Sequence, residues 1–207
     1  MGSKHSLSGT EKGIEGDQMQ IGFYIDQSRC IGCYTCVVAC KDWHDIPAGP
    51  ASWRRVITLE KGRYPKLFMA FLSVSCLHCA QPTCVPACPV NAISKRNEDG
   101  IVVVDREACL GNEQCAMFCK EACPYEAPQF GAEEEAKMQM CDLCVDRWED
   151  GKKPVCVEAC PMRALDAGPV DELEAKYGVL KEGEGFIYIN KNRPSVVFKA
   201  REPELLR

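Results

Sequence analysis

The stretch CIGCYTCVVAC, residues 30–40, decides the fold class of this chain. Its four cysteines are spaced C-x2-C-x2-C-x3-C. Two thiolates three residues apart, on a loop whose amides turn inward, can bind two metal atoms of the same small cluster. The x3 gap suits a short helix, which carries the last thiolate away from the first three. The spacing therefore predicts a metal-binding loop whose fourth cysteine serves a neighbouring site.

Three further groups of four follow, and together the groups use all 16 cysteines of the 207 residues. In chain order, quartets one to four are Cys30, Cys33, Cys36 and Cys40; Cys76, Cys79, Cys84 and Cys88; Cys109, Cys115, Cys119 and Cys123; and Cys141, Cys144, Cys156 and Cys160. The x3 gap before the last cysteine is constant, while the gap before it is x2, x4, x3 or x11. A proline, which tends to end a helix, follows quartets two, three and four. Loop length varies while the ends of the pattern are kept.

Three kinds of chemistry can use cysteines at this density. Disulfides fit poorly, because C-x-x-C pairs lie too close to their own neighbours to join distant segments. Structural zinc suits quartet four taken alone, since tetrahedral zinc sites often contain C-x2-C pairs. Quartet one, however, has the spacing of a bacterial ferredoxin. Taken together, the quartets predict four [4Fe–4S] clusters, with the 16 cysteines as iron ligands.

Composition excludes several other classes. A net charge of −5 and only three histidines argue against a nucleic-acid surface, which would be basic. Residues 1–18 contain no apolar segment, so we expect no signal peptide and a disordered N-terminus. The longest apolar run, at 67–74, is far shorter than the roughly 20 residues of a membrane-spanning helix, which predicts a soluble chain. With no triad, paired-carboxylate motif or phosphate loop in the sequence, we expect no active site of its own.

Strand signals between the quartets indicate how they pair. Runs at Ile93–Lys95 and Ile101–Val104 flank the turn signal Asp99-Gly100 and predict a hairpin that leads into quartet three. Quartets two and three would then form one ferredoxin module at residues 71–130. The strand-like MQIGFYIDQSRC leads into quartet one in the same way, and its expected partner is quartet four.

The predicted fold is α+β, with two bacterial-type 2[4Fe–4S] ferredoxin modules surrounded by short hairpins and helices. The outer module would comprise residues 19–70 plus 131–170, with the inner module inserted between these halves. Within the outer module, residues 48–74 suggest two connecting strands, and the acidic residues 130–140 suggest a helix-permissive, solvated bridge. Residues 171–207 would contribute a C-terminal helix, a strand and a tail, with the helix beginning near Pro169 and ending before Gly178.

The segments CIGCYTCVVACKDWHD, CLHCAQPTCVPACPVNAI, DGIVVVD, ACPYEAPQF and CDLCVDRWEDGKKPVCVEACPMRALDAGP together carry a family resemblance. They resemble the four-cluster iron–sulfur subunit of the dimethyl sulfoxide reductase superfamily, a group that includes electron-transfer subunits of polysulfide, thiosulfate and nitrate reductases and of formate dehydrogenases. The likeness extends over about residues 19–199.

The resemblance implies that the last cysteine is exchanged within each module. Set 1 would be Cys30, Cys33, Cys36 and Cys160; set 2 would be Cys76, Cys79, Cys84 and Cys123; set 3 would be Cys88, Cys109, Cys115 and Cys119; and set 4 would be Cys40, Cys141, Cys144 and Cys156.

The resemblance also implies partners. We expect a catalytic subunit with a molybdenum or tungsten bis-pterin cofactor, and in many members a membrane subunit that interacts with quinone. The chain would pass single electrons between that catalytic subunit and the membrane subunit or a soluble carrier, on the cytoplasmic side or exported with its partner. A free-standing polyferredoxin that serves soluble enzymes, such as a hydrogenase or a tungsten oxidoreductase, is the alternative. A zinc-binding structural protein is a third hypothesis.

Quartet three departs from the family pattern, because its gaps are x5, x3 and x3. The extra residues fall between Cys109 and Cys115, where Gly111-Asn112 suits a turn with positive φ. Because no cysteine is missing, a [4Fe–4S] cluster is favoured over a three-iron cluster.

Several other side chains close to the quartets have expected supporting roles. His78 is expected to pack or to hydrogen-bond near sulfur rather than to bind iron. Trp43, His44 and Trp148 are expected to shield clusters from water. The cations that could raise cluster potentials are Lys41, Lys120, Arg147 and Arg163.

Overall fold

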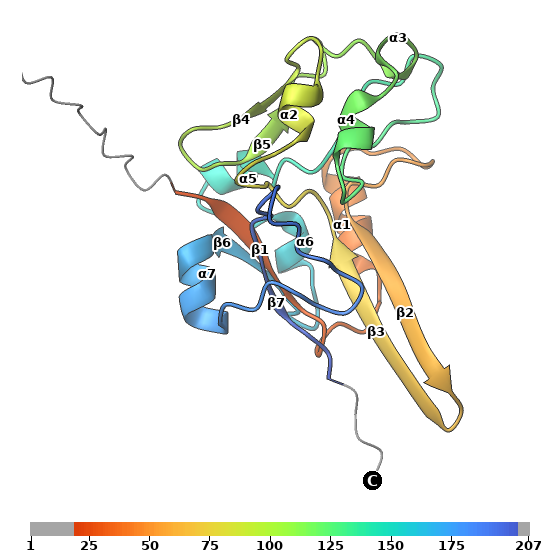
Figure 1. The fold of residues 1–207 in the computed structure, drawn as a ribbon, viewed down its shortest axis with the longest axis vertical. Coiled ribbons are helices and arrows are strands. Elements are labelled where there is room, and N and C mark those ends of the chain that lie inside the picture. The colour runs from red at the N-terminus through yellow and green to blue at the C-terminus, as the bar shows by residue number, and fades with distance from the viewer. Residues whose placement is uncertain (1–18, 203–207) are drawn as a thin grey trace, which may run out of the picture.

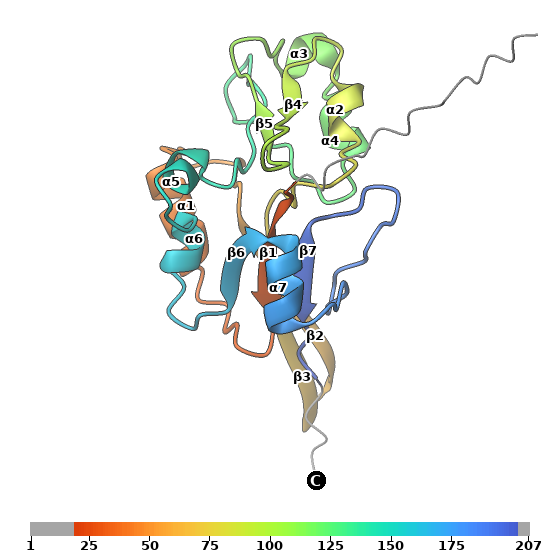
Figure 2. The same cartoon turned by 90° about the vertical axis from the view of Figure 1, so that its left-hand side faces the viewer.

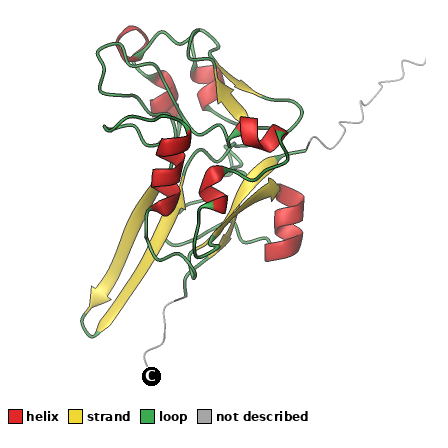
Figure 3. Ribbon diagram, turned by 180° about the vertical axis from the view of Figure 1, so that it is seen from behind, coloured by secondary structure: helices red, strands yellow, loops and turns green. Residues whose placement is uncertain are grey.

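The computed structural model describes residues 19–202, so the N-terminus expected to be disordered lies outside the described residues. The fold is mixed, with short helices and strands joined by long loops (Figure 3). Most helices have only four or five residues, because they are interrupted by the turns that carry the cysteines. Loops therefore hold much of the functional part of the molecule.

A three-stranded sheet has β1 (Ile21–Asp26) in its centre, between β6 (Leu165–Pro169) and β7 (Val196–Lys199). The β1 strand runs antiparallel to β6 and parallel to β7. Helix α7 (Val170–Tyr177) covers one face of the sheet (Figure 2). All six residues of β1 are buried, because α7 covers one face while the main core occupies the other.

Alternation along β1 divides its side chains between two cores. Tyr24 faces α7 and stacks on Tyr177 with ring centroids 3.7 Å apart. Ile21, Phe23 and Ile25 face the main core, which also contains many of the cysteines. This sheet thus anchors the cysteine loops to a rigid frame.

Strands β2 (Arg55–Arg63) and β3 (Lys66–Val74) form a long antiparallel hairpin that projects from the body (Figure 1). Only its base is buried, at Ala70, Leu72, Ser73 and Val74. Residues 48–74 thus contain the two predicted connecting strands.

One end of the molecule holds α2 (Cys84–Ala87), the hairpin of β4 (Ile93–Lys95) and β5 (Val102–Val104), α3 (Asn112–Cys115) and α4 (Phe118–Ala122) (Figure 1). Helix α2 contacts both α4 and β4. The predicted hairpin is confirmed.

A second helical group contains α1 (Thr35–Trp43), α5 (Val145–Glu149) and α6 (Val155–Glu158) (Figure 2). Helix α1 packs on α6 although more than a hundred residues separate them in the chain. Segments that carry quartets one and four are therefore neighbours.

The C-terminal segment contacts both the central sheet and the loop of quartet two. The predicted helix is α7, and the strand is β7, which pairs with β1. Between them, the backbone N–H of Ser195 donates to the carbonyl of Leu77 at 3.0 Å. The Asn192 amide also donates to the Thr83 hydroxyl at 2.7 Å. This segment thus joins the central sheet to quartet two.

Candidate iron–sulfur sites

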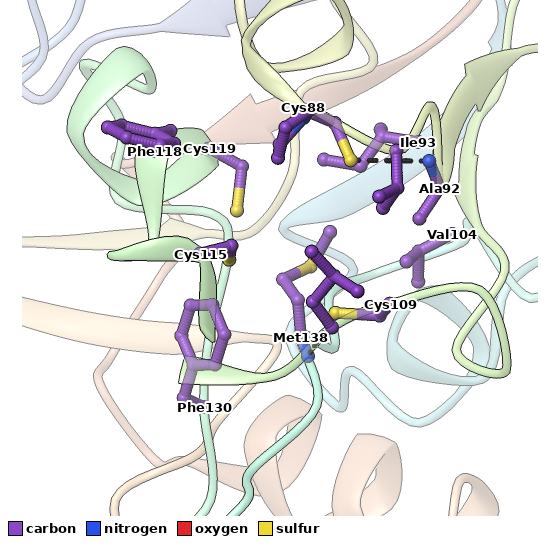
Figure 4. Close-up of a pocket in the computed structure, with 13 residues that line it drawn as sticks. Cys88, Ala92, Ile93, Val104, Cys109, Cys115, Phe118, Cys119, Phe130 and Met138 are labelled. Carbon is purple, nitrogen blue, oxygen red and sulfur yellow. Dashed lines mark hydrogen bonds between the residues drawn. The ribbon is translucent and has the colours of Figure 1, made fainter. Parts of the chain in front are cut away.

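All 16 cysteines lie among the described residues, and every thiol is free. The structure gathers twelve of them around three cavities, four to each cavity. The first cavity is lined by set 1, the second by set 2 and the third by set 3. Figure 4 shows the four sulfurs of set 3 around the third cavity, with Phe118, Phe130 and Met138 beside them.

The remaining cysteines, those of set 4, also lie close to one another. The pKa of Cys40 is raised to about 12, mainly by burial and also by the nearby Cys156 thiolate, although the positive charge of Arg54 lowers it. The pKa of Cys141 is raised first by burial and next by Cys40. Cys144 has its pKa raised by burial to about 12, with contributions from Cys156 and Cys40. These mutual effects show that the four sulfurs of set 4 lie near one another.

The three cavities are equal in size, at about 20 Å³ each, and their linings are almost entirely apolar apart from the sulfurs. Four soft thiolates around one small cavity are a donor set for zinc or for an iron–sulfur cluster. The ferredoxin spacing of quartet one favours the iron–sulfur cluster.

A left-handed residue recurs in the first loop of every quartet. The second residue after the first cysteine has positive φ in all four quartets: Gly32 at 68°, His78 at 42°, Gly111 at 87° and Leu143 at 61°. A left-handed residue in such a turn directs successive backbone N–H groups to one side, which favours an anionic ligand. All four quartets thus share a positive-φ residue two positions after the first cysteine, which is consistent with the expected inward-turned amides.

Quartet three keeps this conformation despite its longer loop. Gly111 takes the left-handed position, as predicted, and the extra residues form α3 directly after it. The backbone N–H of Asn112 donates to the carbonyl of Ala136 at 2.9 Å, which attaches the longer loop to the body. Cys109, Cys115 and Cys119 therefore still converge on one cavity.

A second repeated turn follows the last cysteine of quartets two, three and four. The sequence there is C-P-x-x-A, and the residue before the alanine is left-handed: Asn91, Glu126 and Arg163 have φ of 50–53°. The alanine N–H then points back to the cysteine sulfur, with N to Sγ distances of 3.2 Å at Ala92, 3.5 Å at Ala127 and 3.4 Å at Ala164. Donors to a thiolate favour its charged form, which is the form that binds metal.

Quartet one lacks the proline, and α1 continues past Cys40 to Trp43. The next residue, His44, lies with Nε2 3.2 Å from the sulfur of Cys144. Asp142 and Cys144 form with His44 a compact group of possible metal ligands, but Cys144 already belongs to set 4. We therefore interpret His44 as a hydrogen-bond partner of set 4.

The structure gives His78 a defined tautomer. Its Nδ1 accepts the backbone N–H of Val102 at 3.1 Å, so the ring proton is on Nε2. Burial lowers its pKa to about 3, with smaller contributions from the positive charges of Lys95 and Arg54. Its Nε2 is one of the buried polar atoms without a partner among residues 19–202. A donor of this kind, between two cysteines of set 2, suits a sulfur acceptor.

The other side chains singled out from the sequence lie mainly at the surface. Trp43 is 45% exposed, and its indole N–H donates to Asp146 at 3.0 Å. Arg147 lies over the Trp43 ring, with 4.7 Å from its guanidinium carbon to the ring centroid. Trp148 is partly buried against the main core. Lys120 and Arg163 are exposed, and Lys41 donates to the carbonyl of Ala51 at 2.7 Å.

Sequence reasoning missed the two cations with the closest association to the sulfurs. Arg54 is 1% exposed, and Lys95 is half-buried with its ammonium 3.1 Å from the carbonyl of Cys79. Neither residue is next to a cysteine quartet in the sequence, so a search of the residues that flank the quartets did not find them. The only signal for Arg54 was a charged residue directly before a predicted strand.

Comparison with known proteins is consistent with this geometry. A family model described as "4Fe-4S dicluster domain" matches residues 67–170, and one described as "4Fe-4S binding domain" matches residues 22–42. One chain of the anaerobic dimethyl sulfoxide reductase of Escherichia coli is 45% identical over 188 residues, which cover 87% of this chain and 88% of that protein. This protein belongs to the same family of iron–sulfur subunits.

Two relatives with other substrates belong to the same family. One subunit of the sulfite dehydrogenase of Allochromatium vinosum is 36% identical, with 81% of this chain and 76% of that protein covered. The formate dehydrogenase iron–sulfur subunit of Wolinella succinogenes is 37% identical, with 81% and 92% covered.

Membership of this family settles the class of function. Iron–sulfur subunits of this family transfer electrons within multi-subunit oxidoreductases, and the free-standing polyferredoxin is not favoured. The cofactors are [4Fe–4S] clusters, and 16 cysteines provide the ligands of four. Among residues 19–202, no helix is long and apolar enough to cross a membrane.

Proposed function

We propose that this subunit conducts single electrons along a line of four clusters, held by sets 1 to 4 in the order 1, 4, 2, 3. Each [4Fe–4S] cluster supplies a one-electron redox centre, while the protein fixes its place and tunes its potential. The gathering of one set of four sulfurs around each of three separate cavities is the observation that carries this proposal.

Contacts between sets support the order. The charge of Cys36, in set 1, acts on Cys156 in set 4. Cys141 of set 4 acts on the buried Cys76 of set 2, and Cys119 of set 3 acts on Cys84 of set 2. Sets 1 and 3 would therefore be the two ends of the line.

Contacts between helices and strands support an inner module inserted into an outer one. Strand β1 pairs with β6, and α1 packs on α6, so segments on either side of residues 71–130 associate with each other. Within residues 71–130, α2 contacts α4. We infer that each half of the line belongs to one module, with sets 1 and 4 in the outer module and sets 2 and 3 in the inner one.

Both proposed ends are surrounded by exposed apolar side chains. Around set 1 these are Ile31, Tyr34, Val38 and Met162, each 39–65% exposed. Around set 3 they are Val90, Leu110 and Phe118, each 38–48% exposed. Apolar patches of this kind at a protein surface mark interaction sites. We therefore propose that partner subunits dock at both ends, which brings their redox groups close to sets 1 and 3.

One partner would be a large catalytic subunit with a molybdenum or tungsten bis-pterin cofactor, and the other a membrane subunit that interacts with quinone. The names of the relatives support a catalytic partner, since each names a reductase or dehydrogenase. Membrane association would arise through the partner.

Anaerobic purification of the native protein tests the proposal. We expect a complex with a large subunit that contains molybdenum or tungsten, and about 16 iron atoms on this chain, four for each cluster. A redox titration followed by EPR should resolve four one-electron steps. Recovery of this chain alone as a monomer, or a zinc content in place of iron, would contradict the proposal.

A further inference from the structure

Arg54 is a fully buried cation in the described part of the molecule. It directly precedes β2, and only 1% of its surface is exposed. Within residues 19–202, no carboxylate forms an ion pair with it. A buried charge without a partner is strongly unfavourable. The negative charge that balances Arg54 must therefore come from another source.

Packing and hydrogen bonds hold the guanidinium in one orientation. Its Nη1 lies 3.1 Å from the hydroxyl of Ser73, and its Nη2 lies 3.0 Å from the hydroxyl of Ser75. The ring of Phe23 lies beneath it, with 4.6 Å between the guanidinium carbon and the ring centroid. Its Nε, also buried, has no acceptor among the described residues. The Nε–H is thus a donor without an acceptor among the described residues, in surroundings that contain cysteine sulfurs.

The surroundings of Arg54 contain cysteines of two sets. Ser73 links it to set 1, because the Ser73 hydroxyl is also 3.4 Å from the sulfur of Cys36. For set 4, the sulfurs of Cys156, Cys141 and Cys40 lie within electrostatic range of Arg54. Trp53, directly before Arg54, also packs against the small core cluster that contains Cys40. Arg54 thus lies at the junction of sets 1 and 4, within range of sulfurs from both.

We propose that Arg54 is the shared counter-ion of sets 1 and 4, and that its fixed positive charge raises the reduction potentials of both clusters. The inference rests on the ligand sets of the proposed function. A cluster becomes more negative when it accepts an electron, so a nearby cation stabilises the reduced state more than the oxidised state. Because Arg54 is buried, solvent and salt screen this effect far less than they screen a surface charge.

Potentiometric titration of the anaerobic protein, followed by EPR, tests this role. In Arg54→Gln, we expect two of the four midpoint potentials to fall, each by at least a tenfold change in the one-electron equilibrium constant, or about 59 mV. The other two potentials should shift by less than the equivalent of a twofold change in that equilibrium constant. In Arg54→Lys, which keeps the charge, both potentials should differ from those of the wild type by less than the equivalent of a twofold change in the equilibrium constant.

Arg163→Gln is the matched control, because it removes the same charge from an exposed side chain three residues after Cys160 of set 1. In this variant we expect each of the four potentials to shift by less than the equivalent of a twofold change in the one-electron equilibrium constant. If wild-type protein holds four clusters but Arg54→Gln shifts none, or shifts all four equally, the role of Arg54 is wrong while the ligand sets stand. Wild-type protein with fewer clusters would instead contradict the proposed function.

A loss of iron in Arg54→Gln is also decisive when the lysine variant is measured beside it. Arg54→Lys with four clusters and near-normal potentials would support a counter-ion, since lysine keeps the charge but lacks the planar guanidinium with its forked hydrogen bonds. If the lysine variant also loses clusters, Arg54 acts through its shape and hydrogen bonds, and the proposal is overturned.

Discussion

The ammonium of Lys95 donates to the side-chain carbonyl of Gln20 at 2.5 Å, and this contact joins the end of β4 to the residue before β1. The same ammonium donates to the carbonyls of Cys79 and Gly100, at 3.1 and 2.8 Å. Gln20 in turn donates to the carbonyl of His78 at 2.9 Å. A small polar network thus attaches quartet two and the β4–β5 hairpin to the start of the central sheet.

Replacing Lys95 by methionine should destabilise this junction. The variant keeps the aliphatic stem but removes the ammonium donor from the oxygens of Gln20 and Cys79, while the Gly100 carbonyl still accepts from the Gln20 amide at 3.3 Å. We expect the free energy of unfolding to fall by about 2 kcal/mol. Anaerobic thermal unfolding and hydrogen exchange at the Ile21 amide, which donates to Asp99, would measure this. Lys66→Met, at the exposed tip of the β2–β3 hairpin, should change stability by less than about 0.5 kcal/mol. Equal effects of the two variants would contradict the assignment.

Single cysteine variants test the exchange of ligands within the inner module. Cys88→Ala should alter the same EPR signal as Cys109→Ala, because both residues line one cavity. Cys123→Ala should instead reproduce the effect of Cys84→Ala. If Cys88→Ala matches Cys84→Ala, each quartet serves one cluster by itself and the crossed assignment is wrong.

Asp166 on β6 should make a pH-dependent contribution to stability. Burial raises its pKa, but hydrogen bonds from Tyr177, Lys153 and Lys176 outweigh this and lower it to about 2. Its stabilisation is therefore present above the unfolded pKa of about 3.9 and is lost as pH falls towards 2. We expect Asp166→Asn to cost about 1–2 kcal/mol between pH 5 and 8, after allowance for solvent screening.

Urea unfolding of wild type and Asp166→Asn at a series of pH values would measure that difference. The gap between the two proteins should narrow only below about pH 4. Asp171→Asn, an exposed change in the first turn of α7, is the control and should show a smaller difference. A gap that persists unchanged to pH 3 would show that the charge of Asp166 is not its source.

Val38 tests the docking surface around set 1. It is 65% exposed on α1 and does not line the set 1 cavity, so Val38→Asp should leave the iron content unchanged. A charge in an apolar interface is costly, and we expect at least a tenfold weaker association with a partner subunit. Val179→Asp, at a site with 69% exposure beyond the end of α7, is the matched control. Association that weakens equally in both variants would count against this surface.

Some features followed from the sequence because they depend on local spacing. Quartet one has the ferredoxin spacing, and the x3 gap before the last cysteine holds in all four quartets. Gly111 could be predicted to take a positive φ because glycine has no Cβ to clash in that conformation. The hairpin of β4 and β5 followed from its turn signal, since such turns are set by a few adjacent residues.

Residues 130–140 show why local preference was insufficient elsewhere. Their composition permits a helix, yet none forms there in the described structure. Met138 and Met140 are buried against the cysteine cavities, and the backbone N–H of Met138 donates to the sulfur of Cys109 at 3.4 Å. The acidic residues before them are exposed, as predicted. Tertiary burial and a hydrogen bond to sulfur decided this segment.

The number of sulfur ligands and the spacing of each group can be read directly from the cysteine positions. The buried cation that lies near the sulfurs could not be read in this way, because the folding of distant segments places it there. The residues around Arg54 in the sequence give no sign of a functional role. Arg54 is linked to Cys36 through the hydroxyl of Ser73, which is nineteen residues after Arg54 in the chain. The pairing of β2 with β3 brings these residues together, because Val56 lies opposite Ser73 in the hairpin. Charge placement of this kind depends on contacts between distant segments, which local sequence patterns do not encode.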